Sequence, residues 1–224
     1  HIDIQKPFKE RKEVIAYYPI LKDEDDVNRT YLSLNFVLGK NTDPEIYLLA
    51  NILALMLIES EAAPVKKALL QSGIGEDVFS INIGGLQPGF GIVAKHTSKE
   101  KKEEFEKIIF DTLKNLVEKG IDKKLIEASI NIMEYSLREA GNFATKGLVY
   151  NMQSMDSWLY DGSPTTHLQY ENTINKLRKN IDTGYFERFI QERLIENTHS
   201  SLVIIEPKKG LGEEKDRAVE KKLA

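Results

Sequence analysis

The run from Ile46 to Ile58 most constrains what this chain can fold into, because a helix built from it is apolar on nearly every side. Asp43 is a typical N-cap residue, Pro44 suits the first helical position, and Glu45 favours the positive end of the helix dipole. The run is too short to cross a bilayer. The helix must therefore lie inside a core, and a chain of 224 residues is long enough to build one.

Segments rich in β-branched, aromatic and aliphatic residues stand on both sides of this helix and are predicted to be strands. They cover residues 13–21, 31–38, 77–83, 90–95 and 201–206, and the last is expected to end at Pro207. Only a short acidic turn separates the first two, so we expect them to pair as antiparallel neighbours. The glycine-rich link 84–89 is expected to be a hairpin connection, because neither Lys-Ser or Lys-Thr nor a helix follows it, as a phosphate-binding loop would require.

Helical periodicity and stop signals predict further helices at 62–73, 99–119 and 122–140, and more helical segments between residues 163 and 194. The element order is therefore β-β-α-α-β-β, then several helices, then a last β. Runs of strands and runs of helices, without strict βαβ alternation, indicate the α+β class. The expected architecture is a mainly antiparallel sheet with helices packed on it.

The segment 142–161 is less regular and rich in large apolar and aromatic side chains. They are Phe143, Leu148, Tyr150, Met152, Met155, Trp158, Leu159 and Tyr160. Since aromatic residues at helical spacing are commoner inside proteins than outside, we expect these side chains to plug one side of the core. An exposed binding patch is the alternative.

The charge balance of the chain argues against nucleic acid and anionic membranes as partners. A formal net charge of −4 and a pI of about 5.7 provide no broad attraction to nucleic acid or anionic lipid. The absence of cysteine excludes disulfides and thiolate metal sites. The acidic group Asp23–Asp26 lacks the ligand spacing and central glycine of a calcium loop, so a solvated turn is expected there.

No constellation of catalytic residues emerges from the spacing. The four histidines are His1, His96, His167 and His199. None has another histidine or a cysteine at metal-ligand spacing, so surface or capping roles are expected for them. Glu127 and Glu134 share one helix face, but without a nucleophile or metal beside them they are expected to be exposed charges. We therefore assign no catalytic, cofactor-binding or metal-binding residue in this chain.

Both ends of the chain lead to an expectation about its context. The first residue is His1 rather than methionine, and residues 213–224 are highly charged and resemble the start of a helix with nothing to pack on. We therefore expect this chain to be a piece of a longer polypeptide.

Several runs resemble the second domain of presequence proteases, which belong to the pitrilysin and insulinase group of zinc metallopeptidases. The runs begin at Tyr31 (YLSLNFVLG), Ala62 (AAPVKKALLQSGIG), Asp122 (DKKLIEASIN), Lys146 (KGLVY), Asp156 (DSWLYDG) and Gly184 (GYFERFI). The resemblance covers about residues 6–212, as a single α+β domain. Residues 213–224 resemble the start of the charged helical linker that joins the two halves of those enzymes.

The resemblance implies a place in a larger enzyme but no chemistry in this chain. Family members consist of four similar α+β domains in two halves that close around an unfolded peptide, and the first domain carries an inverted zinc motif, His-x-x-Glu-His. Asn51, Ala54 and Leu55 stand approximately where that motif would place its histidines and its glutamate. An alanine cannot accept a proton and a leucine cannot ligate zinc. The resemblance thus implies an inactive domain with no cofactor of its own, and zinc in the catalytic domain of the parent enzyme.

The leading hypothesis is a non-catalytic structural domain of a zinc-dependent peptidase that degrades unfolded peptides inside a closed chamber. Its partners would be the adjacent catalytic domain, the helical linker and, in the full enzyme, the peptide substrate, with no nucleic acid or membrane. The alternative is a stand-alone scaffold or peptide-binding subunit. A third possibility is an independent hydrolase that uses His167 or His199. The resemblance favours the bacterial cytoplasm as the compartment, with an organelle matrix as the other option.

Overall fold

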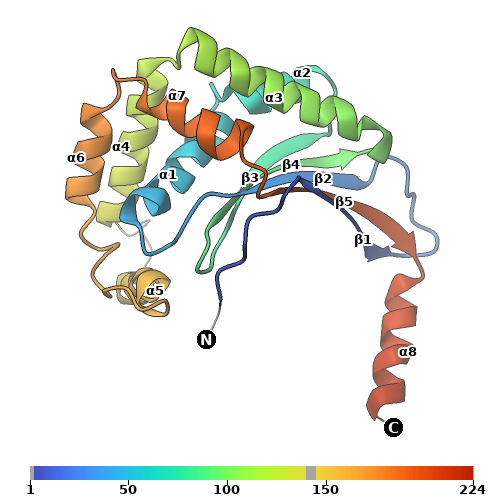
Figure 1. The fold of residues 1–224 in the computed structure, drawn as a ribbon. Coiled ribbons are helices and arrows are strands. Elements are labelled where there is room, and N and C mark those ends of the chain that lie inside the picture. Colours follow the sequence, from blue (N-terminus) through green and yellow to red (C-terminus); the bar gives the residue numbers. More distant parts are fainter. Residues whose placement is uncertain (1–2, 140–144, 224) are drawn as a thin grey trace.

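The computed structural model describes residues 3–139 and 145–223, which form one curved sheet with helices on one face only (Figure 1). His1, Phe143 and the expected helix end at Ala140 lie outside the described residues. The opposite face of the sheet is left open by the helices, and the N-terminal segment runs along it (Figure 1). The predicted α+β class and its layer of helices on a sheet are confirmed.

The sheet has five strands in the order β1-β5-β2-β4-β3. The strands are β1 (Lys12–Ile20), β2 (Thr30–Val37), β3 (Asp77–Ile83), β4 (Gly89–Thr97) and β5 (Ser200–Lys209). Three of the neighbouring pairs are antiparallel, and the β1–β5 pair is parallel. The hairpin predicted between β3 and β4 is confirmed.

The predicted antiparallel pairing of the first two strands is wrong, because β5 lies between them. The connection over residues 21–29 is long enough to step across one strand, a distance of roughly 10 Å. The last strand also continues past Pro207 to Lys209. β2 pairs with β5 only as far as Ile205, so at Pro207 the strand β5 is paired with β1 alone. The missing N–H of Pro207 therefore removes no hydrogen bond to β2.

The apolar run forms the central helix, as predicted. α1 (Pro44–Ala54) continues into a π-helical turn (Leu55–Glu59), and α2 (Pro64–Gln71) follows. Asp43 caps α1 by accepting a hydrogen bond of 2.9 Å from the Glu45 backbone N–H. The helical stretch from Pro44 to Gln71 is long and apolar enough to cross a membrane by length and composition, but 61% of its most apolar window is buried inside this domain. A helix in the core of its own domain meets the same criterion.

The remaining helices surround α1. They are α3 (Lys102–Lys119), α4 (Lys123–Glu139), α5 (Lys146–Trp158), α6 (Glu171–Lys179), α7 (Tyr185–Ile190) and α8 (Leu211–Leu223). α3 and α7 lie with α1 and α2 over the covered face of the sheet, and α4 and α6 pack outside α1 (Figure 1). α8 projects from the far end of β5 and has no buried residue among those described. A helix is therefore present where the charged linker was expected.

The prediction that residues 142–161 plug the core is wrong for the part that the structure describes. α5 is a regular helix at the margin of the domain, below α1 and α6 (Figure 1). Its side chains Leu148, Met152, Met155 and Trp158 are exposed and Tyr150 is half-buried, whereas its buried residues are Gln153 and Ser157. The reason is that the polar face of α5 packs on its own loop, which leaves the apolar face outward.

Candidate functional site

The helix positions that resemble the zinc motif carry no site. Asn51 donates a hydrogen bond of 2.9 Å to the Tyr47 carbonyl and accepts one of 2.9 Å from the Asn82 amide. Ala54 is buried, and Leu55 packs against the core. Neither has a donor atom for a metal. Within residues 3–139 and 145–223, no three His, Cys, Asp or Glu side chains come together in a group that could hold a metal ion, so zinc does not fit this part of the chain.

The three histidines within the described residues, His96, His167 and His199, do not form a common site. His96 lies in β4, partly exposed, with its Nδ1 2.7 Å from a carboxylate oxygen of Glu76. The expected surface or capping roles are wrong for His167 and His199, since both side chains are buried. Burial lowers the pKa of both rings. Sequence spacing missed this burial because the residues that cover them come from distant segments.

The carboxylates have structural roles. Glu134 on α4 forms ion pairs with Arg178 (2.9 Å) on α6 and with Arg138 (2.8 Å) one turn along its own helix. The hydrogen bond from Arg178 lowers the pKa of the Glu134 carboxyl. Glu127 is exposed. The acidic segment 23–26 is a turn between β1 and β2, in which Glu24 pairs with Arg29. The expected exposed charge is therefore confirmed for Glu127, but it is wrong for Glu134, whose side chain is 23% exposed and lies in an ion-pair network.

A buried polar cluster joins the α5 region to α1. The His167 ring stacks on Tyr47 with centroids 4.0 Å apart, and Asn41 donates a hydrogen bond of 2.7 Å to the Asp156 carbonyl of α5. Gln153 donates a hydrogen bond of 2.9 Å to the His167 carbonyl. Burial, with a smaller contribution from the Asp156 charge, raises the pKa of Tyr47 to about 12. The raised pKa of Tyr47 and the lowered pKa of His167 keep these two stacked rings neutral near pH 7, as a structural contact would require.

The outer face of α5 is the largest departure from the expected pattern of burial. Its exposed side chains are Leu148 (58% exposed), Met152 (63%), Met155 (37%), Trp158 (60%) and Leu159 (63%). Four of them follow the i, i+4, i+7, i+11 spacing of a single helix face, and we call the five together the α5 stripe. A contiguous exposed apolar face marks an interaction surface.

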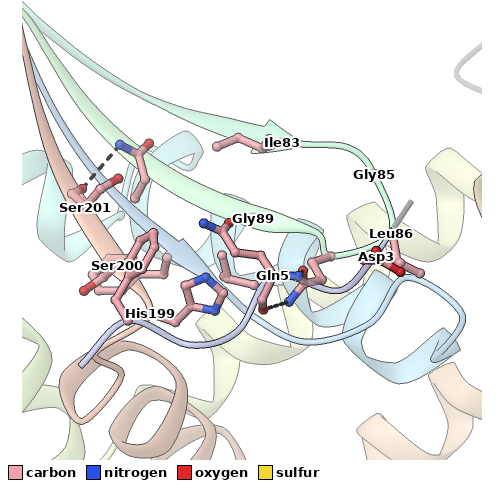
Figure 2. A pocket seen from close by; sticks show the side chains of 14 residues that line it. Asp3, Gln5, Ile83, Gly85, Leu86, Gly89, His199, Ser200 and Ser201 are labelled. Atoms are coloured by element: carbon pink, nitrogen blue, oxygen red, sulfur yellow. Dashed lines mark hydrogen bonds between the residues drawn. The ribbon is translucent and has the colours of Figure 1, made fainter. Parts of the chain in front are cut away.

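The open face of the sheet provides a second candidate surface. A pocket of about 430 Å³ lies at the strand ends, between β2, the β3–β4 hairpin, the start of β5 and the N-terminal segment (Figure 2). Its walls include Phe8, Ile83 and Leu86, and the His199 ring projects between the N-terminal segment and the strands (Figure 2). The volume falls in the usual range of ligand pockets. No sequence pattern indicates this pocket, because its lining comes from segments that are far apart in the chain.

Comparisons with known proteins agree on one family. A family model described as the peptidase M16 inactive domain matches residues 1–133. The protein HypA of Clostridium perfringens is 46% identical over 222 residues, which cover 98% of this chain and 23% of that protein. Presequence protease 1 (chloroplastic/mitochondrial) of Arabidopsis thaliana is 34% identical over 215 residues, which cover 92% of this chain and 20% of that protein. The chain thus spans less than a quarter of the length of these relatives.

Solved structures show the same fold. The inactive peptidase domain of a zinc protease from Bordetella parapertussis superposes with a TM-score of 0.65 at 12% identity, covering 80% of this chain and 93% of that one. A protease from Helicobacter pylori superposes with a TM-score of 0.65 at 14% identity, covering 92% of this chain and 48% of that one.

Proposed function

The chain belongs to the peptidase M16 inactive domain family, and we propose that it serves as a non-catalytic structural domain within a zinc-dependent peptidase that degrades unfolded peptides inside a closed chamber. In this proposal, zinc and the catalytic residues belong to an adjacent domain of the parent enzyme. Asn51, Ala54 and Leu55 support the assignment of catalysis to another domain. These three positions lack the two zinc-binding histidines and the general base that the motif requires.

The observation that carries the proposal is the α5 stripe. Burying a Leu or Met side chain fully contributes about 1.5–3 kcal/mol, so a helix that exposes several of them loses stabilisation that a covering surface would supply. The relatives are more than four times the length of this chain, and the additional chain in a parent enzyme would provide that surface. We assign the stripe to contact with the adjacent catalytic domain.

The other exposed parts of the fold would complete the arrangement. The open face of the sheet would form part of the chamber wall, and α8 would lead into the linker between the two halves. The ion pair between Lys22 and Glu213 (2.7 Å) and the one between Lys208 and Glu214 (3.2 Å) support a defined direction for the start of α8. Both pairs are exposed, so each contributes little to stability.

A second candidate, a peptide-binding or scaffold subunit, is favoured by one observation. The pocket on the open face is large enough for an apolar side chain and is bordered by groups that can hydrogen-bond a peptide backbone. Such a subunit would bind peptides without a catalytic domain beside it.

The first experiment tests whether the chain alone is catalytic, which neither the structural-domain function nor the peptide-binding function requires. The purified chain is assayed for bound zinc by elemental analysis and for cleavage of unstructured peptides with and without a chelator. We expect no stoichiometric zinc and no chelator-sensitive cleavage. One tightly bound zinc with chelator-sensitive cleavage would overturn the proposal.

The second experiment tests the structural role directly. This chain replaces the matched segment of Arabidopsis presequence protease 1, and cleavage by the chimera is compared with that of a Met152→Glu/Leu159→Glu version. We expect the chimera to cleave peptides and the double variant to lose roughly tenfold or more of that activity, because two carboxylates would be placed in an apolar interface. Val219→Glu, which changes an exposed apolar residue of α8, is the matched control. Equal activity of the double variant and the control would contradict the assignment of the α5 stripe.

A further inference from the structure

The helix α5 and the loop that follows it, residues 146–169, lie at the margin of the domain, below α1 and α6 (Figure 1). We call these residues the α5 arm. Among the described helices and strands, none packs extensively on α5. Ser157 donates its hydrogen bond of 2.6 Å to the Ser163 carbonyl, which belongs to the arm itself. A segment with so few contacts to its surroundings opens at a lower free energy than the core of the domain.

The α5 arm is attached to the start of α1 around His167. The His167 ring is 2% exposed and stacks on Tyr47 of α1 with centroids 4.0 Å apart. Asn41, just before α1, donates a hydrogen bond of 2.7 Å to the Asp156 carbonyl of the arm. The Gln153 amide of α5 donates one of 2.9 Å to the His167 carbonyl. His167 therefore contacts α1 through its ring and holds α5 through its backbone.

The surroundings of the His167 ring suit only its neutral form. Within the described residues, neither Nδ1 nor Nε2 of this ring has a hydrogen-bond partner. A second proton would place a positive charge and a further N–H group in the same buried space. A buried charge without a partner is costly, so the protonated ring is stabilised by moving into water.

The titratable groups around the ring do not reverse this preference. Asp43, at the N-terminus of α1, and the Asn41 backbone favour the charged ring, but burial has the larger effect and lowers the pKa of His167. Tyr47 stays neutral because burial raises its pKa to about 12. Burial also raises the pKa of Asp156, and protonation of that carboxyl would favour the attached arm. Since an ordinary aspartate titrates near about 3.9, this opposing effect acts at a lower pH than that of His167.

The rest of the domain does not depend on the α5 arm. Leu49 and Leu53 of α1 are fully buried between the sheet and the outer helices. α6 begins at Glu171, directly after the arm, and its buried Ile174 and Leu177 keep it on α1 and α4. Loss of the His167 contact therefore frees the arm and leaves the core in place.

We propose that His167 is a pH-sensitive switch whose protonation releases the α5 arm from α1 while the sheet and α1 stay folded. The released ring is in water and binds a proton more readily than the attached ring does. Each pH unit below about 6.5 therefore increases the ratio of released to attached arm by up to roughly tenfold, until the pH reaches the lower pKa of the attached ring. The inference goes beyond the proposed function, because the release takes place in this chain whatever the α5 stripe contacts.

The test is amide hydrogen exchange of the unchanged full chain at about pH 7.5 and about pH 5.5, followed by mass spectrometry. Exchange is expressed as protection factors, which removes the intrinsic effect of pH on the rate. We expect protection in residues 146–158 to fall roughly tenfold at the lower pH, with no change in α1 or in the strands. Constant protection of α5 would overturn the proposal. So would an equal loss of protection in α1, since that result would mean unfolding of the whole domain.

Two variants separate protonation from packing. His167→Phe keeps a ring to stack on Tyr47 and cannot take up a proton, so the protection of α5 should be the same at both pH values. His199→Phe is the matched control, because it removes another buried histidine, which contacts Phe8 rather than Tyr47. This control should keep the pH response of α5. A response that persists in His167→Phe, or that disappears in His199→Phe, would contradict the assignment to His167.

A further measurement needs no variant and holds even if His167→Phe does not fold. Trp158 is the single tryptophan of the chain and belongs to α5, so its fluorescence anisotropy reports the motion of the arm. An NMR titration of the histidine rings is recorded on the same unchanged chain. We expect the anisotropy to decrease with the midpoint at which His167 titrates. An anisotropy that stays constant down to about pH 5, or that follows another histidine, would overturn the proposal.

Discussion

α1 and α5 are both rich in large apolar residues, yet the fold treats them in opposite ways. On α1, Leu49 and Leu53 are fully buried between the sheet and the outer helices. On α5, Leu148 and Met152 are more than half exposed, while Gln153 and Ser157 are buried. α1 therefore buries its apolar residues, as a core helix does. α5 shows the opposite pattern, with its apolar face exposed and polar residues buried.

The difference shows what an apolar pattern determines. A helix that is apolar on nearly all sides has no acceptable orientation except full burial, so α1 could only be central. A helix with one apolar face can turn that face either toward the domain or toward solvent. In α5, hydrogen bonds from the polar face to the domain favour the second orientation. Ser157 donates a hydrogen bond of 2.6 Å to the Ser163 carbonyl, and Gln153 holds the His167 carbonyl. The apolar face of α5 is thereby turned toward solvent in the described residues.

The largest effect is expected at the centre of α1. Leu53→Ala should lower the free energy of unfolding by about 3 kcal/mol, because a fully buried leucine leaves both lost transfer free energy and a cavity. Met152→Ala on α5 is the matched control and should change stability by no more than about 0.5 kcal/mol. Urea unfolding followed by circular dichroism measures both. Similar losses for the two variants would remove the contrast between the helices.

The inner face of α5 should come next. Gln153→Leu keeps the side chain roughly the same size but removes the donor to the buried His167 carbonyl, which should destabilise the chain by about 1–3 kcal/mol. Ser154→Ala is not a suitable control because its hydroxyl also bonds within the helix, to the Tyr150 carbonyl. Asn151→Leu, at an exposed position of α5, is a better one. If Gln153→Leu stabilised the chain, the polar interior of α5 would not be what orients it.

The same contrast explains how far the sequence could predict the fold. The burial of α1, its Asp43 cap and the strand segments follow from local patterns, which a sequence displays directly. The insertion of β5 between β1 and β2 does not, because it pairs Val14 with Val203 across most of the chain. The outward stripe of α5 also does not, since periodicity identifies an apolar face but not the surface that covers it.

The features of the candidate site also fall into those that the sequence displays and those that appear only in the fold. The lack of zinc ligands at Ala54 and Leu55 is visible in residue types alone. The pocket depends on the return of Gln5 to Gln87, and the burial of His167 depends on its stack with Tyr47. Both contacts join segments whose proximity exists only after folding, so no spacing rule could have indicated them.

The contact between α1 and the α5 region should depend on pH. Burial lowers the pKa of His167, so the unfolded chain takes up a proton more readily than the folded chain as the pH falls below about 6.5. Stability should therefore decrease from pH 7 toward pH 5. His167→Phe keeps a ring to stack on Tyr47 and removes the titrating group, so its stability should decrease less over this range in urea unfolding. His199→Phe should also reduce the loss of stability at low pH, because burial lowers the pKa of His199 as well, and His199 contacts Phe8 rather than Tyr47. Parallel stability profiles of His167→Phe and the unchanged chain would contradict this account.

The smallest effect on the free energy of unfolding is expected for substitutions on the outer face of α5. This face gives the most sensitive test of the contrast between α1 and α5. Leu148→Gln should leave the free energy of unfolding within about 0.5 kcal/mol of its original value, since the side chain is 58% exposed and its replacement stays in water. Leu137→Gln is the matched control, because Leu137 lies at a similar place near one end of α4 but is 9% exposed, and its replacement should cost more than 1 kcal/mol. A loss above 1 kcal/mol for Leu148→Gln would mean that the isolated chain already covers the stripe. A neutral result would leave the stripe as apolar surface that this domain does not use for its own stability, which is the property that a contact with another domain requires.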